Sequence, residues 1–189
     1  MGSREPKGKS VVDWVAKTKD RASAGTFAEV ATWAEIAVLA TLWAGTENAI
    51  RLAGPNLGGK LVIDVTNPLN FPPNAPPGLA IGFSDSGGEQ VQRWLPQAKV
   101  VKAFNIIGNA YMVNPKFPGG PPDMFICGND DGSKRQVTEI CSAFGWPTTD
   151  IGGIEGARLL EPLAMLWVTY GVRSRSWSHA FKLLRIQGS

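Results

Sequence analysis

The chain has 189 residues, of which 43% are hydrophobic and 19% are charged, and its formal net charge is +3. This length predicts a single domain over residues 1–189 with a sizeable core. The composition is that of a globular protein and excludes a disordered or fibrous chain. No apolar stretch reaches the roughly 18 residues that span a bilayer, and no signal peptide is visible. The sequence therefore predicts a cytoplasmic protein without membrane contact.

The excess of positive charge lies at the N-terminus. The first 21 residues carry six basic and three acidic side chains, whereas the rest of the chain carries equal numbers of each. A nucleic-acid-binding protein would show a long basic stripe, so the pattern favours a local anion site and argues against a nucleic-acid partner. A solvated basic helix face would look the same. The basic residues are Arg4, Lys7, Lys9, Lys17, Lys19 and Arg21.

The first predicted element is the end of a strand at Gly2-Ser3-Arg4. A hydroxyl followed by an arginine at the carboxyl end of a strand suits the 2′-phosphate of NADP, because Arg meets phosphate through a planar fork of donors. In a dinucleotide fold, a strand, a Gly-rich turn and a helix should precede this pair. The fingerprint G-x-G-x-x-G does not occur, and Gly152-Gly153-Ile154-Glu155-Gly156 has the wrong spacing. We therefore expect a domain without its pyrophosphate seat, which binds nucleotide weakly.

Strands and helices then alternate along the chain, which predicts a parallel α/β sheet of the Rossmann type. Thr26 and Glu29 form a capping-box signature at the start of a helix. The apolar run 35–42 suits a strand buried on both faces, although without a first strand beside it this strand would become an edge. The predicted strands are 22–26, 35–42, 60–67, 99–105, 124–127 and 148–151. The predicted helices are 10–16, one that Thr26 caps, 43–53, 84–95, 131–144, 154–171 and 176–185, the last two forming a closing helical segment over 151–189.

The chain can be matched to a family through five segments. They resemble the NADPH-dependent oxidoreductases related to coenzyme F420 reductase, and the resemblance covers essentially the whole chain. The N-terminus departs from the family pattern, in which a strand, a Gly-rich turn and a helix come first. We expect a start codon placed too late or a truncated gene to explain this difference. The segments are Gly2-Ser3-Arg4, Ala40-Thr41-Leu42-Trp43, Val62-Ile63-Asp64-Val65-Thr66-Asn67-Pro68, Gly88-Glu89-Gln90 and Val100-Val101-Lys102-Ala103-Phe104-Asn105.

The resemblance implies roles for residues at the ends of the predicted strands. Ser3 and Arg4 would hold the 2′-phosphate, and Lys7 or Lys9 would add charge. Two further groups complete the implied cofactor site: Thr41, Leu42 and Trp43 beside the nicotinamide ribose, and Asn67 and Pro68 at the same edge. Phe104 and Asn105 would face the second ring system, where the archaeal reductases commonly carry a histidine in place of Asn105.

Several of these residues have an equally simple structural explanation. Ser3-Arg4 would fit an ordinary polar turn, Trp43 could only cover the core, and Asn67 could only cap the loop. Asn70 and Phe71, in the Pro-rich loop 68–83, could shape a substrate pocket or lie on a surface loop. Trp167 and Tyr170 on the first closing helix fit core residues better than pocket residues.

No catalytic acid, base or nucleophile and no metal cluster is apparent, and His179 is interpreted as a surface or packing residue. Cys127 and Cys141 show no metal or disulfide spacing and are interpreted as buried and reduced. The lack of an apparent catalytic group is compatible with direct hydride transfer between two stacked cofactor rings, because the protein then needs only to position the rings.

The predicted function is hydride transfer between NADP(H) and a deazaflavin such as coenzyme F420, or a flavin-like acceptor. The alternatives are an NADP-dependent reductase of a small carbonyl or imine substrate, and a non-catalytic remnant that forms a homodimer.

Overall fold

A five-stranded sheet forms the centre of the computed structural model, which describes residues 1–19 and 21–186. The strand order is β1-β2-β5-β6-β7; β5 and β6 are antiparallel, and the other neighbours are parallel. The predicted Rossmann-like α/β fold is confirmed, with a sheet that is mostly rather than entirely parallel. The strands are β1 (Ile36–Leu39), β2 (Leu61–Asp64), β5 (Lys99–Lys102), β6 (Met124–Gly128) and β7 (Thr148–Asp150).

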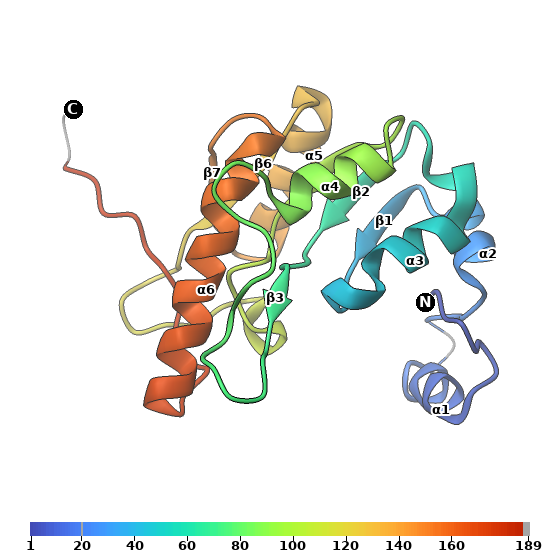
Figure 1. Cartoon of the computed structure of the whole chain (residues 1–189), viewed down its shortest axis with the longest axis horizontal. Helices are drawn as coiled ribbons and strands as arrows, with labels where there is room; N and C mark the ends of the chain where they lie inside the picture. The colour runs from blue at the N-terminus through green and yellow to red at the C-terminus, as the bar shows by residue number, and fades with distance from the viewer. Residues whose placement is uncertain (20, 187–189) are drawn as a thin grey trace.

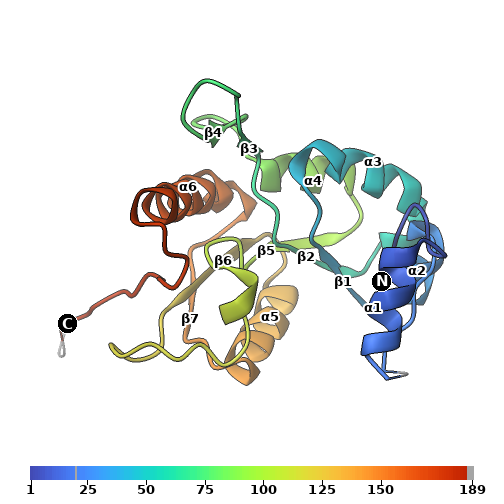
Figure 2. The same ribbon diagram turned by 90° about the horizontal axis from the view of Figure 1, so that it is seen from below.

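Helices cover both faces of this sheet. Helices α3, α4 and α6 lie on one face and α5 on the other (Figure 1, Figure 2). Side chains alternate accordingly along the strands, as the two-residue period of a strand requires. Val62 and Val100 pack on the α3–α4–α6 side, and Ile63 and Val101 pack on the α5 side. The helices are α1 (Lys9–Lys17), α2 (Phe27–Trp33), α3 (Trp43–Ala53), α4 (Gly87–Trp94), α5 (Asp131–Ala143) and α6 (Ala157–Ser174).

The predicted capping box at the start of α2 is confirmed. The Glu29 amide donates to Thr26 Oγ1 at 3.2 Å, and the Thr26 amide donates to Glu29 Oε2 at 2.7 Å. These two bonds satisfy donors that a helix N-terminus otherwise leaves unpaired. Before α2, the predicted strand 22–26 is reduced to a single parallel bridge between Gly25 and Gly2.

The long loop after β2 contains a small hairpin that the sequence did not predict. Strands β3 (Leu69–Asn70) and β4 (Gly78–Leu79) pair antiparallel there. Three short 3₁₀ turns complete the described secondary structure: η1 (Gly54–Leu57), η2 (Asn109–Tyr111) and η3 (Ile154–Gly156). No helix in residues 1–19 and 21–186 combines the length and the apolar character needed to cross a bilayer.

The predicted helix over 176–185 is wrong. Helix α6 ends where Arg175 adopts a left-handed conformation at φ 53°, and the chain then runs on without helix to residue 186. Its backbone makes other bonds: the Asp123 amide donates to the Phe181 carbonyl at 3.0 Å, and the Leu183 amide donates to Asp123 Oδ2 at 2.9 Å. The closing segment predicted for 151–189 thus contains one long helix, and its last three residues lie outside the described part.

Strand β1 is less buried than its apolar sequence predicts. Val38 is 60% exposed, because β1 is the edge of the sheet and in the described residues no strand pairs with its outer side. A run that is apolar on both faces therefore does not become a doubly covered strand here. The expectation that this strand would be an edge is confirmed.

Candidate functional site

The carboxyl ends of β1, β2 and β5 meet at one edge of the sheet, because these three strands are parallel. Thr41, Asn67 and Asn105 follow them in the chain, each within a few residues of the strand end. Ligands in open α/β sheets bind outside the carboxyl ends of the strands. The topology therefore brings three of the predicted site segments to the edge where a ligand is expected.

The segment after β1 leads directly into α3. Leu42 is 87% exposed, and the Thr41 hydroxyl lies 2.8 Å from the hydroxyl of Thr46, which is buried. The Trp43 ring stacks on Trp94 of α4 at a centroid distance of 5.5 Å and an interplanar angle of 27°. Trp43 thus packs two helices together, which agrees with the alternative reading of this residue as core cover. Leu42, which is exposed, and Thr41, which is half-buried, are the residues of this segment that a ligand can reach.

Asn67 and Asn105 lie side by side at the ends of β2 and β5. Asn67 Nδ2 donates to the Asn105 carbonyl at 2.8 Å, and Asn105 Nδ2 donates to Asn67 Oδ1 at 3.0 Å and to the Leu160 carbonyl at 3.0 Å. Asn105 Oδ1 is buried without a partner. Most of the hydrogen-bonding capacity of both amides is used within the protein. Pro68, next to Asn67, is buried, and its carbonyl accepts from the Ala80 amide at 2.7 Å.

Phe104 does not face an open site. It is 5% exposed, its ring lies 6.0 Å from the Phe144 ring, and its amide donates to Met124 Sδ at 3.2 Å. Its φ of +58° is unusual for a bulky residue and marks a strained turn at the end of β5. This turn brings Asn105 toward Asn67, so Phe104 shapes the strand end from inside the core.

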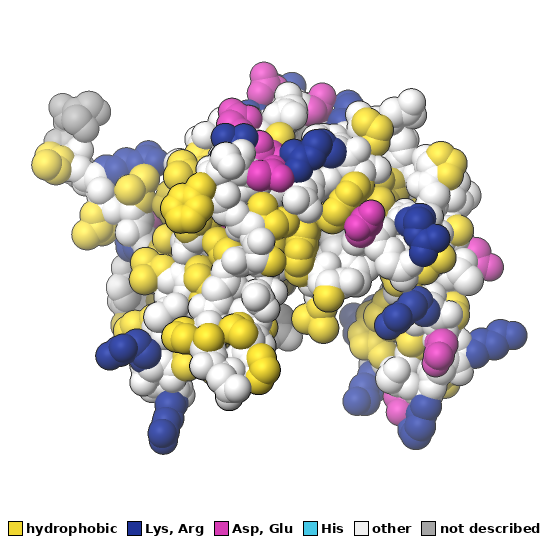
Figure 3. Space-filling view, viewed as in Figure 1, with side chains coloured by type: hydrophobic (Ala, Val, Ile, Leu, Met, Phe, Trp, Pro, Cys, Tyr) yellow, Lys and Arg dark blue, Asp and Glu magenta, His cyan; other side chains and the backbone are white. Residues whose placement is uncertain are grey.

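The N-terminal residues form a separate polar hollow of about 390 Å³. Arg4 is exposed and takes part in no ion pair of the described residues, and Ser3 Oγ accepts from the Glu5 amide at 3.1 Å. Helix α1 begins beside the hollow without a side-chain cap, so its first amides are available. Basic side chains gather over this corner (Figure 3). The lining residues are Ser3, Arg4, Glu5, Gly8, Ser10 and Val11.

Lys9 is not directed at this hollow. Its ammonium pairs with Asp13 Oδ2 at 2.6 Å across one turn of α1, and both side chains are mostly exposed. Lys9 is also absent from the residues that line the hollow. The structure therefore brings Ser3 and Arg4 together and leaves Lys9 on the solvent side of α1.

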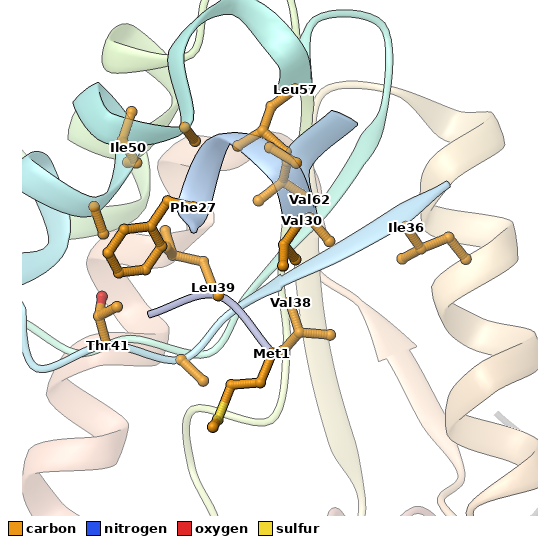
Figure 4. A pocket seen from close by; sticks show the side chains of 16 residues that line it. Met1, Phe27, Val30, Ile36, Val38, Leu39, Thr41, Ile50, Leu57 and Val62 are labelled. Carbon is orange, nitrogen blue, oxygen red and sulfur yellow. The ribbon is translucent and has the colours of Figure 1, made fainter. Parts of the chain in front are cut away.

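A groove of about 430 Å³ runs along the outer edge of β1 (Figure 4). Met1 and Gly2 line one side of it and Thr41 lies at its end, so the groove runs from the residues just before the polar hollow to the segment after β1. Thr41 is the only residue of the lining with a polar side chain. The corner around Arg4 fits a phosphate, but this apolar groove does not fit the pyrophosphate of a dinucleotide. The remaining lining comes from Phe27, Val30, Ala31, Ile36–Ala40, Ala49, Ile50, Ala53, Leu57 and Val62.

A second apolar groove lies between α6 and the segment that follows β4, and we call it the α6 groove. Its volume is about 760 Å³. Phe83 is fully exposed at its rim, and Leu159 and Leu166 on α6 are 69% and 57% exposed. Arg158 at its end is held by Glu89 of α4, with Arg158 Nε 2.8 Å from Glu89 Oε2. The groove is lined by Leu79–Phe83, Glu155, Arg158, Leu159, Pro162, Met165, Leu166 and Thr169.

The aromatic residues on α6 have packing roles. Trp167 is buried, and its Nε1 donates to the His179 carbonyl at 2.8 Å. The His179 ring stacks on Trp167 at 4.7 Å and meets Tyr170 edge-on at 4.6 Å. Neither Trp167 nor Tyr170 lines the α6 groove. These contacts agree with the interpretation of His179 as a packing residue.

Sequence reasoning missed one group of residues beside this edge. Asp64, Lys102 and Glu161 form a cluster of charged side chains with at most 1% exposure. Two of them are visible in the sequence as single charges inside apolar strand segments, a signal that could have identified them. Within the described residues no group of histidines, cysteines and carboxylates is arranged to hold a metal ion.

Comparison with known proteins places this geometry in a family. No protein-family model matches the chain. A solved structure from Arthrobacter sp. FB24, provisionally named an F420-dependent NADP reductase, is 34% identical, covers 97% of this chain and 87% of its own, and superimposes with a TM-score of 0.90. The chain belongs to the family of NADP-dependent oxidoreductases related to F420-dependent NADP reductase.

One more distant relative and one structure with a similar fold were also found for this oxidoreductase family member. The metalloreductase STEAP3 of Rattus norvegicus is 31% identical over 112 residues, which are 58% of this chain and 21% of that protein. The chain therefore spans about a fifth of that relative's length. An imine reductase of Streptomyces aurantiacus shares the fold, with a TM-score of 0.56 at 14% identity over 89% of this chain and 53% of its own.

Proposed function

We propose that this chain is an oxidoreductase domain that transfers hydride between NADP(H) and a planar deazaflavin or flavin-like acceptor. The observation that carries the proposal is the 34% identity over nearly the whole chain to the provisionally named F420-dependent NADP reductase. The geometry adds two features: a polar corner whose Arg4 makes no ion pair with any described residue, and the apolar α6 groove.

The polar corner is the part of the proposed cofactor site that the residues fit best. Arg4 offers a planar fork of donors, Ser3 and Ser10 offer hydroxyls, and the uncapped start of α1 offers amides. Helix N-termini and arginines both favour phosphate. Glu5 also lines the hollow and opposes an anion, so Arg4 has to offset its charge. We assign the 2′-phosphate of NADP(H) to this corner.

The α6 groove is where we place the acceptor. It is apolar and broad, and the Ala80 amide in its lining bonds to the carbonyl of Pro68, which directly follows Asn67. Small-molecule sites are mostly apolar clefts with a few polar groups. Leu42, Asn67 and Pro68 would then lie on the nicotinamide side. Asn105 would shape the site by holding Asn67, and Phe104 by packing beneath it.

The residues at this edge suit a reaction that needs no acid or base from the protein. Bound NADP(H) supplies or receives the hydride at its nicotinamide ring, and the protein contributes position and an environment poor in water. Lys102 and its two carboxylates beside the edge are buried and paired with each other, and Arg158 in the α6 groove is paired with Glu89. The proposed function therefore depends on how the site positions the two rings, and it uses no catalytic acid or base.

A reductase of a small carbonyl or imine substrate is the second candidate. Asn105 stands where the archaeal reductases that this chain resembles commonly carry a histidine, and this difference concerns the acceptor side alone. The hydrophobic lining of the α6 groove would accept a small cyclic imine as readily as a larger ring. The two candidates share the nucleotide site and differ in the acceptor.

Two measurements test the proposal. Fluorescence titration with NADPH and NADH should show a preference for NADPH, and oxidation of NADPH should require an oxidised deazaflavin, FMN or FAD in the assay. Turnover with a cyclic imine and with none of these rings would favour the second candidate. Binding of neither nucleotide would contradict both and would favour the non-catalytic alternative.

A further inference from the structure

The buried charged cluster lies where four elements meet. Asp64 ends β2 and Lys102 ends β5, and the two are directly opposite each other in the sheet. Glu161 comes from α6, and its carboxylate reaches the first turn of α4. The Lys102 ammonium has three hydrogens and three acceptors: Asp64 Oδ2 at 2.8 Å, Glu161 Oε1 at 3.1 Å and the Thr66 carbonyl at 2.8 Å.

The two carboxylates are also bonded to the backbone. The Gly87 amide donates to Glu161 Oε2 and the Gly88 amide donates to Glu161 Oε1, both at 2.9 Å. The Thr66 amide and hydroxyl donate to Asp64 Oδ1 at 2.9 and 2.7 Å. Each of the four carboxylate oxygens therefore has a partner. Ser86 caps α4 locally through the Glu89 amide, and Glu161 adds acceptors for the two preceding amides from a different helix, which ties α4 to α6.

The approach of these elements is close enough to require glycine. A Cβ at Gly88 would lie 2.8 Å from the Ala157 Cβ and 2.9 Å from Lys102 Cε. Only a residue without a side chain lets α4 come this near to both β5 and α6. The Gly-Gly pair at the start of α4 thus belongs to the same arrangement as the charges.

Stability alone does not explain this cluster. Removing three charges from water is costly, and apolar side chains of similar volume often give equal or greater stability. Burial raises the pKa of Glu161, an effect that Lys102 and the two glycine amides only partly oppose. Burial alone would lower the pKa of Lys102, but its two carboxylate partners outweigh burial and raise it. Unlike an apolar cluster, a charged cluster fixes the positions of its members relative to one another.

The position that it defines is that of α6 against the strand ends. Glu161 binds Lys102, while the carbonyl of Leu160, the preceding residue, accepts from Asn105. Thr66, whose carbonyl accepts from Lys102, directly precedes Asn67. Two consecutive residues of α6 are therefore fixed directly to the end of β5, and Lys102 links that end to the segment after β2. The same helix supplies Leu159 and Leu166 to the α6 groove.

We infer that Lys102 and Glu161 are positioning residues, which hold α6 at the distance from β2 and β5 that sets the width of the α6 groove. The inference rests on the proposed function only in naming the groove's occupant as the hydride acceptor. Neither residue touches the acceptor, since both are buried beneath the groove. Their effect is exerted through Asn67, Asn105 and the exposed face of α6.

Glu161→Gln is the test, with Glu139→Gln on the exposed side of α5 as its control. The Lys102–Asp64 pair remains neutral in Glu161→Gln, so the variant should fold with an unchanged circular dichroism spectrum. We expect kcat/KM for the acceptor to fall by about tenfold to a hundredfold, because displaced positioning elements cost rate on that scale. The preference for NADPH over NADH, which the polar corner sets, should be unchanged. Wild-type kcat/KM for the acceptor in Glu161→Gln would overturn the inference.

Hydrogen exchange gives a readout that does not require activity. In Glu161→Gln, amides of residues 87–91 and 157–166 should exchange faster together, while those of α5 keep wild-type rates. Uniform acceleration that includes α5 would indicate loss of global stability and would overturn the positioning role. If wild-type protein reduces no acceptor, the proposed function fails, but this exchange pattern still decides the inference.

A second variant covers the case in which Glu161→Gln does not fold. The triple change Asp64→Asn, Lys102→Met and Glu161→Gln removes all three charges and keeps oxygen acceptors for the Thr66 and glycine amides. It should fold and show the same local exchange in α4 and α6. Wild-type exchange in both helices would show that the charges do not set their position.

Discussion

Asn67 and Asn105 bind each other across the ends of two neighbouring strands. Asn67 Nδ2 reaches the Asn105 carbonyl at 2.8 Å, and Asn105 Nδ2 reaches Asn67 Oδ1 at 3.0 Å. A primary amide has two donors and one acceptor oxygen, so this pairing leaves Asn67 one N–H for a ligand. Asn105 spends its other N–H on the Leu160 carbonyl. The pair is thus a structural clamp with a small remaining capacity for binding.

Asn105→Ala should destabilise the fold. The change removes one buried and one partly buried hydrogen bond, and it takes the side-chain donor away from the Leu160 carbonyl, which costs about 1–3 kcal/mol. Urea denaturation followed by tryptophan fluorescence measures the loss. Asn70→Ala, at an exposed position in β3, is the control and should change little. Equal stability of the two variants would show that the clamp contributes nothing.

Arg4→Ala should abolish the preference for NADPH over NADH. Arg4 is the exposed cation that lines the polar corner, and removing it takes away the planar fork that distinguishes a 2′-phosphate from a hydroxyl. Titration of both nucleotides at two salt concentrations measures the preference, which should weaken with salt in the wild type. Lys17→Ala, which removes one charge from the far end of α1, should keep it. If the preference for NADPH survives in Arg4→Ala, the 2′-phosphate binds at another site.

Much of the fold could be predicted because its signals are local. Helix α3 was predicted at 43–53, as observed, and the capping box of α2 was readable from Thr26 and Glu29. The tail after Ser174 was mispredicted because its conformation depends on distant contacts. One is the contact with Asp123, whose amide donates to the Phe181 carbonyl at 3.0 Å and whose Oδ2 accepts from the Leu183 amide at 2.9 Å. Periodicity within the tail contains no information about such a contact.

Some residues of the candidate site could likewise be predicted from the sequence, and others could not. Asn67 and Asn105 could be placed together because both follow parallel strands, and that rule needs only the strand order. Glu161 could not be predicted, since its partners belong to β5 and α4 and its own helix surrounds it with apolar residues. The inward position of Phe104 could not be predicted either, because its positive φ contradicts the intrinsic preference of a bulky residue.

The ion pair between Asp85, just before α4, and Arg93, in its last turn, should make a small contribution to stability that depends on pH. Arg93 lies 2.7 Å from Asp85 Oδ2 and lowers the pKa of that carboxyl from 3.8 to about 2. A lowered pKa means that the contribution is present above pH 3.8 and is lost as the pH falls through about 2. Both side chains are partly exposed, so screening keeps it below about 1 kcal/mol. In Asp85→Asn, the difference in the free energy of unfolding between pH 5 and pH 2 should be smaller than in the wild type by that amount.

Two glycine-to-alanine changes should have opposite effects. Gly88→Ala places a Cβ 2.8 Å from the Ala157 Cβ and 2.9 Å from Lys102, so overpacking should cost about 1–3 kcal/mol. At Gly45, in α3, a Cβ would meet nothing within 4 Å. Gly45→Ala should therefore stabilise the helix by up to about 1 kcal/mol, because alanine has the higher helix propensity. Thermal melts compare the two, and equal shifts would contradict the tight approach at α4.

Neither cysteine should react with a thiol reagent in the native protein. Burial raises the pKa of Cys127 to about 12 and that of Cys141 to about 11, and both side chains have no exposed surface. The thiolate is the reactive form, so reaction has to wait for opening of the core. Ellman's reagent at pH 8 should label neither thiol in the folded state and both in denaturant. Gly88→Ala should label faster than wild type, since a less stable core opens more often; rapid labelling of the wild type would show that this part of the core is not closed.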